Sequence, residues 1–410
     1  MAGPLPIGDK PPEDGRFSEL ELSGSDTRTL HAYLHIPFCT VKCGYCDFNT
    51  YTATELGTVK QSDFANTLIQ EISLSSRILK ESNSPSRKLT SVFFGGGTPS
   101  LLPAADLAQM LNKLDSEFGF TSDAEITFEA NPDSVTKESL ASLRSAGFNR
   151  ISIGMQSAVP EVLMTLERTH NPENVAIALK MAKDLGFRTS LDLIFGAPGE
   201  TLSQWEQTML QVIDLDPGHL SAYSLIVEPG TKLARQISSG ELAQVDEDLQ
   251  ADKYELADTL LSEAGYEWYE ISNWSKSPEL QSSHNLAYWS GQDWWGYGPG
   301  AHSHLGSVRW WNHKHPLSYA NLLEKGISPA AGREQLNPDT VALERILLES
   351  RTSEGMSIEQ IKKLQPDSEV AISQLIADGL IEGPQAIAGK LLLTLKGRLL
   401  ADAVVRALSS

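Results

Sequence analysis

The sequence predicts an α/β fold, a partial barrel of six β/α units followed by a smaller helical domain. Between about residue 31 and residue 230, short apolar runs alternate six times with longer segments that carry apolar residues at helical spacing. This alternation is typical of a parallel sheet or partial barrel with helices outside it. Each apolar run also leads into Cys, Gly, Glu, Gln or Asp. Such residues are expected where the carboxyl ends of parallel strands form an active-site rim.

The six predicted strands are short apolar runs bounded by polar or glycine-rich segments. In chain order they read AYLHI from Ala32, SVFF from Ser91, EITFE from Glu125, RISIG from Arg150, SLDLIF from Ser190 and LSAYSLI from Leu220. The intervening segments QSDFANTLIQEISLSSRIL and NPENVAIALKMAKDLGF repeat apolar residues every three or four positions, as amphipathic helices do.

Composition divides the 410 residues into four predicted parts. Residues 1–30 are acidic and proline-rich, which predicts a flexible tail and not a secretory signal or transit peptide. Residues 31–235 are the barrel core. Residues 236–315 are an aromatic- and histidine-rich extension, with seven of the eight tryptophans and five of the nine histidines between Trp268 and His315. Residues 316–410 contain two helical stretches, a short strand and a helix, and predict a winged-helix-like domain.

The charge balance restricts the partners of the protein. The chain has 33 basic and 53 acidic residues, a net charge of −20. A charge of this sign repels nucleic acid and anionic lipid, so we expect no nucleic-acid partner. Since no run approaches the length of a membrane span, we expect a soluble protein of the cytoplasm.

Cys39, Cys43 and Cys46 are the only cysteines and directly follow the first predicted strand. They lie too close together in sequence to hold a fold by disulfides, which leaves metal or redox chemistry. A closed zinc site would need a fourth ligand, for which His35 is the nearest candidate. An iron–sulfur cluster is ordinarily held by four cysteines, so three would leave one iron open to another ligand.

The spacing C-x3-C-x2-C after a first strand resembles the signature of radical S-adenosylmethionine (SAM) proteins, in which the open iron of a [4Fe-4S] cluster binds SAM. Further motifs follow in the order YLHIPFC, CGYCDF, GGGTPS, FEANP, RISIGMQS and DLIFGAPGET. As a set they resemble the branch that contains oxygen-independent coproporphyrinogen III oxidase and the heme chaperone HemW. The resemblance runs from about Ala32 to near the C-terminus and implies a radical SAM barrel.

This resemblance implies a site for the cluster and for SAM. Cys39, Cys43 and Cys46 would bind the cluster. The positions that match SAM contacts are Tyr33, Tyr45, Gly96, Gly97, Thr98, Glu129, Gln156, Arg168, Asp192, Ile226 and His302. Carboxylates suit the ribose hydroxyls, and a guanidinium suits the SAM carboxylate. Taken singly, each residue has an ordinary explanation as a cap, a surface ion pair or a core side chain. Because they lie at the ends of successive strands, a shared binding site is favoured over separate ordinary roles.

Two functions of different classes match these motifs. An oxidase would remove hydrogen from the propionate side chains of coproporphyrinogen III, whereas a heme chaperone would keep the cluster and SAM and deliver heme. Three features favour the chaperone. The oxidase pattern continues to a further cysteine where this chain has Phe48, only 38 residues precede Cys39, and HNLAYW from His284 matches the H-N-x-x-Y-W motif of HemW proteins.

The heme candidates are therefore His284, Asn285, Tyr288 and Trp289. Histidine is a common axial ligand of heme iron, and aromatic rings offer flat apolar area. A lone histidine beside aromatic residues is more often a core residue, so the iron ligand stays open. The resemblance implies heme and heme-accepting proteins as partners. A homodimer, a peripheral contact with membrane-bound acceptors and the cleavage of SAM are left open.

Overall fold

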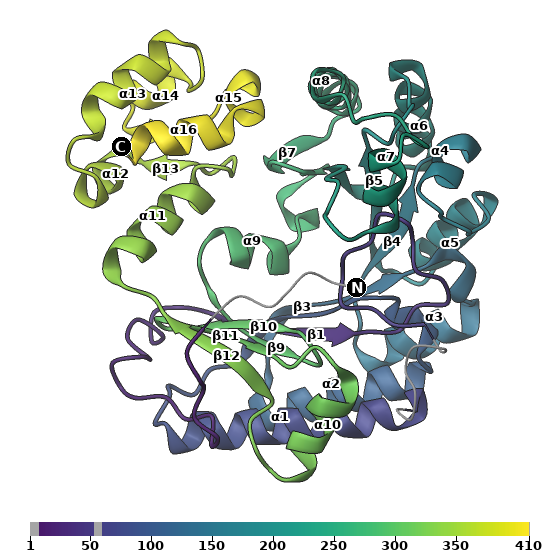
Figure 1. Cartoon of the computed structure of the whole chain (residues 1–410), viewed down its shortest axis with the longest axis vertical. Coiled ribbons are helices and arrows are strands. Elements are labelled where there is room, and N and C mark those ends of the chain that lie inside the picture. The colour runs from purple at the N-terminus through teal and green to yellow at the C-terminus, as the bar shows by residue number, and fades with distance from the viewer. Residues whose placement is uncertain (1–7, 53–59, 410) are drawn as a thin grey trace.

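The structure is a computed structural model that describes residues 8–52 and 60–409. Its centre is a sheet of twelve strands, counted over these described residues, in the order β12-β11-β10-β9-β1-β2-β3-β4-β5-β6-β8-β7 (Figure 1). The six central strands are β1 (Leu30–Ile36), β2 (Leu89–Gly96), β3 (Phe120–Ala130), β4 (Arg150–Gln156), β5 (Arg188–Phe195) and β6 (Gly218–Ser224). Each pairs in parallel with the next, which confirms the predicted series of six strands.

Strands from the later part of the chain extend the sheet at both sides. They are β7 (Glu267–Glu270), β8 (Asn273–Ser275), β9 (Asp293–Tyr297), β10 (His302–Leu305), β11 (Val308–Asn312) and β12 (Ala330–Gln335). Strand β9 pairs in parallel with β1, and β8 pairs antiparallel with β6. The predicted extension over residues 236–315 therefore shares one sheet with the predicted core.

Helices cover the outer face of the parallel strands. They are α1 (Phe64–Glu81), α2 (Ala104–Phe118), α3 (Lys137–Ala146), α5 (Glu173–Asp184), α6 (Leu202–Leu215) and α8 (Glu247–Glu263). Helices α4 (Pro160–Thr165) and α7 (Lys232–Ser238) contribute to a separate apolar cluster that packs against Tyr45. Two more, α9 (Ser283–Trp289) and α10 (Pro316–Glu324), belong to the later strands. Helices α1 and α5 confirm the two predicted amphipathic segments. None of the described helices combines the length and apolar character that crossing a bilayer requires.

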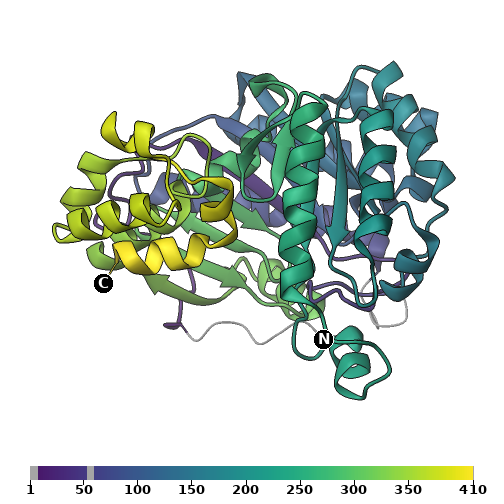
Figure 2. The same ribbon diagram turned by 90° about the horizontal axis from the view of Figure 1, so that it is seen from above.

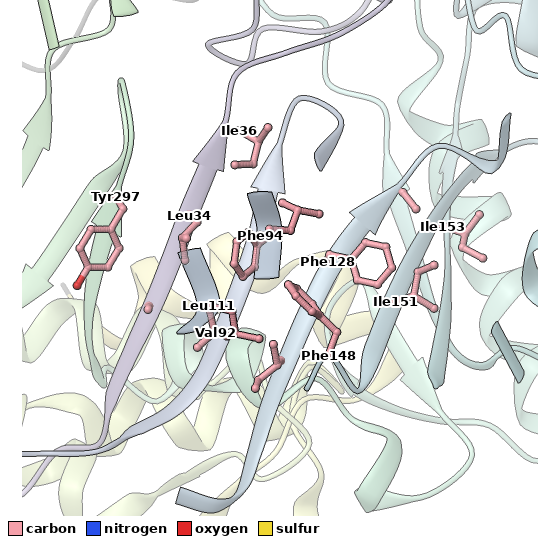
Figure 3. Packing of buried hydrophobic residues seen from close by; sticks show 14 of the residues in the cluster. Leu34, Ile36, Val92, Phe94, Leu111, Phe128, Phe148, Ile151, Ile153 and Tyr297 are labelled. Carbon is pink, nitrogen blue, oxygen red and sulfur yellow. The ribbon is translucent and has the colours of Figure 1, made fainter. Parts of the chain in front are cut away.

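The alternation of side chains along each strand separates the core from the site. Figure 3 shows Leu34, Val92, Phe94 and Phe128 on the face of the strands that packs against the helices. The Phe148 ring lies 5.1 Å from the ring of Phe94, centroid to centroid. Because successive side chains point to opposite faces of a strand, the intervening residues face the other way, into the interior of the barrel.

The segment before β1 packs against the sheet over its described part. The ring of Phe17 lies 5.2 Å from that of Trp310, and Asp9 and Arg333 exchange two backbone hydrogen bonds of 2.8 and 3.0 Å. The expectation of a flexible tail over residues 1–30 does not anticipate these contacts, since Phe17 is one of few large apolar residues in an otherwise polar stretch. Residues 1–7 lie outside the described residues.

The C-terminal unit has a small core of its own. Its helices are α11 (Pro338–Glu349), α12 (Ile358–Leu364), α13 (Ser368–Ala377), α14 (Gly383–Ile387), α15 (Leu395–Leu399) and α16 (Ala401–Leu408). Strands β13 (Met356–Ser357) and β14 (Lys390–Leu391) pair antiparallel. Figure 2 shows these helices, in yellow, at the opposite side of the molecule from the blue helices of the middle β/α units.

The first helical stretch predicted in this unit is interrupted between α11 and α12. Gly355 has a φ of 58°, and a Cβ placed there would lie 2.2 Å from the carbonyl oxygen of Leu391. The chain must turn at this glycine so that β13 can pair with β14, and this contact comes from a segment far along the sequence.

Candidate functional site

The three cysteines lie on the loop that follows β1, residues 37–52, here called the cysteine loop. The ring of His35, on β1, fixes the later part of this loop to the strand, because its Nε2 bonds the Asn49 carbonyl oxygen at 2.9 Å while its Nδ1 bonds the hydroxyl of Tyr33, on the same strand, at 3.0 Å. The backbone N–H of Cys39 donates to the Tyr51 carbonyl oxygen at 3.1 Å. These bonds hold the loop over the carboxyl end of the sheet.

All three thiols line a single cavity of about 610 Å³. Burial raises the pKa of the Cys39 and Cys46 thiols. The Thr98 hydroxyl lies 3.8 Å from the Cys39 sulfur, and the Arg168 guanidinium lies 3.8 Å from the Cys43 sulfur. Within the part of the chain that the structure describes, no three His, Cys, Asp or Glu side chains are grouped as a single metal ion would need.

The glycine turn after β2 packs its backbone directly against the cysteine loop. Gly97 donates its N–H to Ile36 at 2.7 Å, and a Cβ on Gly97 would lie 2.6 Å from the Phe38 carbonyl oxygen. Gly96 has a φ of 108°, and a Cβ there would lie 2.4 Å from His35 Nδ1. Only glycine permits this approach and this backbone conformation. The glycines therefore let the turn pack against the cysteine loop, beside the cavity that both residues line.

Two carboxyl groups face the cavity from neighbouring strand ends. Burial, with the charge of Asp192 beside it, raises the pKa of Glu129 to about 8. Burial also raises the pKa of Asp192, against the effect of the Ser152 hydroxyl, which donates to its carboxylate at 2.8 Å. Glu129 accepts one bond, from the Gly96 N–H at 3.1 Å.

Gln156 and Arg168 line the cavity beside Gly154 of β4. Gln156 ends β4 with a φ of 60°, which is rare for a residue other than glycine, and its buried Oε1 has no hydrogen-bond partner among the described residues. The Arg168 guanidinium donates to the Gly154 carbonyl oxygen at 3.2 Å and to His170 Nδ1 at 3.2 Å. A strained backbone that holds an unpaired buried amide is a feature of functional sites.

Helix α9, which carries the HNLAYW segment, forms part of the floor of the cavity. The His284 ring is buried and has partners on both nitrogens, Ser91 Oγ at 2.7 Å on Nδ1 and Tyr288 Oη at 2.9 Å on Nε2. Phe93 stacks on it at 5.2 Å between centroids. Burial lowers the pKa of His284 well below its usual value. In this arrangement neither ring nitrogen is free to bind iron.

The cavity brings most of the predicted site residues together. Its lining includes Tyr33, Cys39, Cys43, Tyr45, Cys46, Gly96, Gly97, Thr98, Glu129, Gln156, Arg168, Asp192, His284, Asn285 and Tyr288.

Three predicted residues lie elsewhere. Ile226, just after β6, is 69% exposed and does not line the cavity. His302 stacks on Trp311 at 5.9 Å between centroids, on the outer strands. Trp289 hydrogen-bonds Glu270, beside the C-terminal unit.

The inner part of the cavity contains polar residues that the motifs did not indicate. They are Thr127, Arg150, Ser152, Ser190, His219, Ser221 and Asn273. Several lie two positions before a predicted site residue on the same strand: Thr127 precedes Glu129 and Ser190 precedes Asp192. The two-residue period of a strand places such residues on the same face. That period was the signal that could have identified them.

Comparison with known proteins identifies the family. Residues 33–212 match the model of the Radical SAM superfamily. The chain is 44% identical to the heme chaperone HemW of Mycobacterium tuberculosis (strain ATCC 25618 / H37Rv), over 92% of this chain and 94% of that relative. It is 35% identical to the heme chaperone HemW of Bacillus subtilis (strain 168), over 80% of this chain and 84% of that one.

A solved structure has the same fold. Coproporphyrinogen III oxidase (HemN) from Escherichia coli superimposes with a TM-score of 0.78 over 93% of this chain and 90% of that chain, at 24% identity. A likeness at this identity supports the α/β radical SAM fold alone. The sequence relatives carry the closer assignment, and the chain belongs to the HemW family of the radical SAM superfamily.

Proposed function

We propose that this protein is a heme chaperone that holds a [4Fe-4S] cluster and SAM, binds heme and transfers it to acceptor proteins. The observation that carries the proposal is the 44% identity with a heme chaperone over 94% of that relative's length. The cavity adds physical support, because it gathers three thiols, a glycine turn and a set of polar side chains at the carboxyl ends of parallel strands.

The residues present fit the cluster and SAM. Cys39, Cys43 and Cys46 would hold three irons, which suits a cluster with one open iron. Gly96, Gly97 and Thr98 line the cavity beside the cysteines, where they would contact the amino group of SAM as the resemblance implies. The unpaired Oε1 of Gln156 offers an acceptor to a ligand donor.

The chain's own groups prepare the cavity for a ligand of mixed charge. A pKa of about 8 keeps Glu129 mostly protonated at pH 7 before a ligand binds, so its carboxyl can donate as well as accept a hydrogen bond. Arg168 supplies a fixed cation for a ligand carboxylate. When bound, the cluster and SAM would supply one-electron chemistry at the open iron. The protein's part is to orient SAM and to limit the access of water.

Coproporphyrinogen III oxidase activity is the alternative function, because a solved enzyme of that activity has the same fold. Phe48 stands where the oxidase pattern has its further cysteine, and this departure favours a chaperone. Anaerobically reconstituted protein is expected to show a [4Fe-4S] spectrum that SAM perturbs and to bind heme in a titration. The same sample should not convert coproporphyrinogen III to protoporphyrinogen IX. Robust conversion would replace the chaperone assignment with the oxidase.

The cluster site has its own test. A Cys43→Ala variant should lose the four-iron spectrum on reconstitution, because two thiolates cannot hold three irons. Thr165→Ala, at the half-buried C-terminal end of α4 and outside the cavity lining, is the control and should reconstitute like the wild type. A full cluster in Cys43→Ala would remove Cys43 from the ligand set. The acceptor protein, a homodimer, contact with a membrane-bound acceptor and a cytoplasmic location stay predictions from the sequence.

A further inference from the structure

The mouth of the cavity carries apolar side chains that the SAM site does not need. Two large apolar side chains line the cavity and yet are widely exposed: Phe48 at 59% and Val41 at 48%. Both lie on the cysteine loop, whereas Tyr223, near the end of β6, has its hydroxyl beside Ser221 in the inner part of the cavity. Apolar side chains left exposed at the opening of a cavity are typical of a ligand-binding site.

A cation lies in the same loop. Lys42 also lines the cavity, and over residues 8–52 and 60–409 its ammonium group forms no ion pair or hydrogen bond. The nearby Lys232 is instead bonded to Glu167. The mouth therefore combines flat aromatic and branched apolar surface with one unpaired positive charge.

The floor of the cavity is less suited to a large apolar ligand. Its polar groups already bond one another: His284 bonds Ser91 and Tyr288, and His219 bonds Ser190 and Tyr269, each at 2.7 to 2.9 Å. A ligand that displaced these partners would leave buried polar groups unpaired, at a cost in affinity. A ligand with a large apolar ring and two carboxylates would therefore fit the mouth better than the floor.

We propose that heme binds at this mouth, with its macrocycle against Val41 and Phe48 and a propionate at Lys42. The inference rests on the proposed function, because that function supplies the ligand. Heme in this position lies across the opening of the cavity that would hold SAM. It therefore also acts as a cover, and bound heme slows the exchange of SAM.

The test compares two double variants of the reconstituted, full-length protein. Val41→Ser/Phe48→Ser removes the apolar mouth. Val370→Ser/Ile387→Ser is the matched control, since these residues are 79% and 89% exposed on the C-terminal unit, away from the cavity. Titration with hemin, followed by Soret absorbance, should show heme bound about tenfold more weakly by the mouth variant, as expected for the loss of two apolar contacts. The control should bind like the wild type.

The second measurement follows SAM. Protein loaded with radiolabelled SAM is diluted into unlabelled SAM with and without hemin. Hemin should slow release from the wild type and the control by about tenfold or more, and should have little effect on the mouth variant. If the wild type released SAM at the same rate with and without hemin, bound heme would not cover the cavity.

The possible results distinguish a failure of the proposed heme position from a failure of the proposed chaperone function. If the wild type binds no heme, the proposed function fails and this location fails with it. If the wild type binds heme and the mouth variant binds it equally well, only the location is overturned. Lys42→Gln adds a third arm: it should weaken the binding of heme but not of heme with both propionates esterified. Equal weakening for both ligands would remove Lys42 from the site.

Discussion

Gly97 determines how closely the turn after β2 approaches the cysteine loop. Its N–H bonds Ile36 at 2.7 Å, and the next N–H, of Thr98, bonds Phe38 at 2.8 Å. The two carbonyl groups that accept these bonds are also the atoms nearest to the missing Cβ. The close contact and the hydrogen bonds therefore depend on the same residue.

Gly97→Ala is expected to destabilise the protein by about 1–3 kcal/mol, the usual cost of overpacking, because backbone atoms cannot move aside without breaking these bonds. Urea unfolding measures this cost, and iron content after reconstitution reports the cysteine loop. Gly383→Ala is the control, since its Cβ would meet only Ile376 Cγ2, at 3.6 Å. Equal stability of the two variants would show that the turn has room for a side chain.

The sequence predicted the residues of the site best where a motif ends a strand. The resemblance implied Glu129, Gln156 and Asp192 as SAM contacts at successive strand ends, and the parallel sheet brings them to one cavity. Ile226 and His302 were expected from the resemblance alone, and the structure places neither in the cavity lining. Their positions depend on how a loop after β6 and an outer strand turn, which local sequence does not determine.

At the scale of elements, Glu71 connects α1 to three later segments. Its buried carboxylate accepts bonds from the Gly298 N–H and the Asn312 amide, both at 2.7 Å, and from the Tyr319 hydroxyl. These partners lie in the loop after β9, on β11 and on α10. Burial raises the pKa of Glu71 to about 7.

This raised pKa predicts a pH-dependent stability. The folded protein binds a proton up to about pH 7, whereas the unfolded chain releases it near 4.5, so the free energy of unfolding decreases between these values. The contribution of Glu71 is about 3 kcal/mol, complete below pH 4.5 and lost above pH 7. Glu71→Gln should therefore become more stable relative to the wild type as the pH rises from 5 to 8 in urea unfolding experiments.

Glu81→Gln is the control for this experiment. Glu81 lies on the same helix but is exposed, beside Arg16. This variant should follow the wild-type pH dependence. If Glu71→Gln did the same, another buried carboxyl, such as Glu270, would have to account for the pH effect.

Whole elements were predictable where one period governs a long stretch. The six parallel strands and helices α1 and α5 follow apolar patterns that local geometry imposes. The pairing of β9 with β1 was not predictable, because these strands are more than 250 residues apart and no local pattern specifies the partner of an edge strand. The break before α12 likewise depends on β14, which lies later in the chain.

At the scale of the whole molecule, Arg398 on α15 fixes the C-terminal unit to the barrel. Its guanidinium donates two hydrogen bonds to the Asp258 carboxylate on α8, of 2.8 and 2.6 Å. It also lies over the Trp268 ring, 4.5 Å from the centroid. The side chain is 5% exposed, so this contact is a buried, paired charge between the barrel and the C-terminal unit.

Breaking this pair is expected to loosen the unit as a whole. Arg398→Ala leaves the Asp258 carboxylate without its cation, which costs about 3–5 kcal/mol for a buried pair. Hydrogen exchange should then speed up across α15 and α16, and urea unfolding should show the C-terminal unit melting before the barrel.

Lys396→Ala, on the same helix but at an exposed position, is the control and should change the free energy of unfolding by about 0.5 kcal/mol or less. Arg398→Lys should restore only part of the loss, because an ammonium group cannot reproduce the two-bond fork. Unchanged exchange in Arg398→Ala would assign the docking of the unit to its other contacts with the barrel, the N–H of Ser353 on the Tyr269 carbonyl oxygen among them.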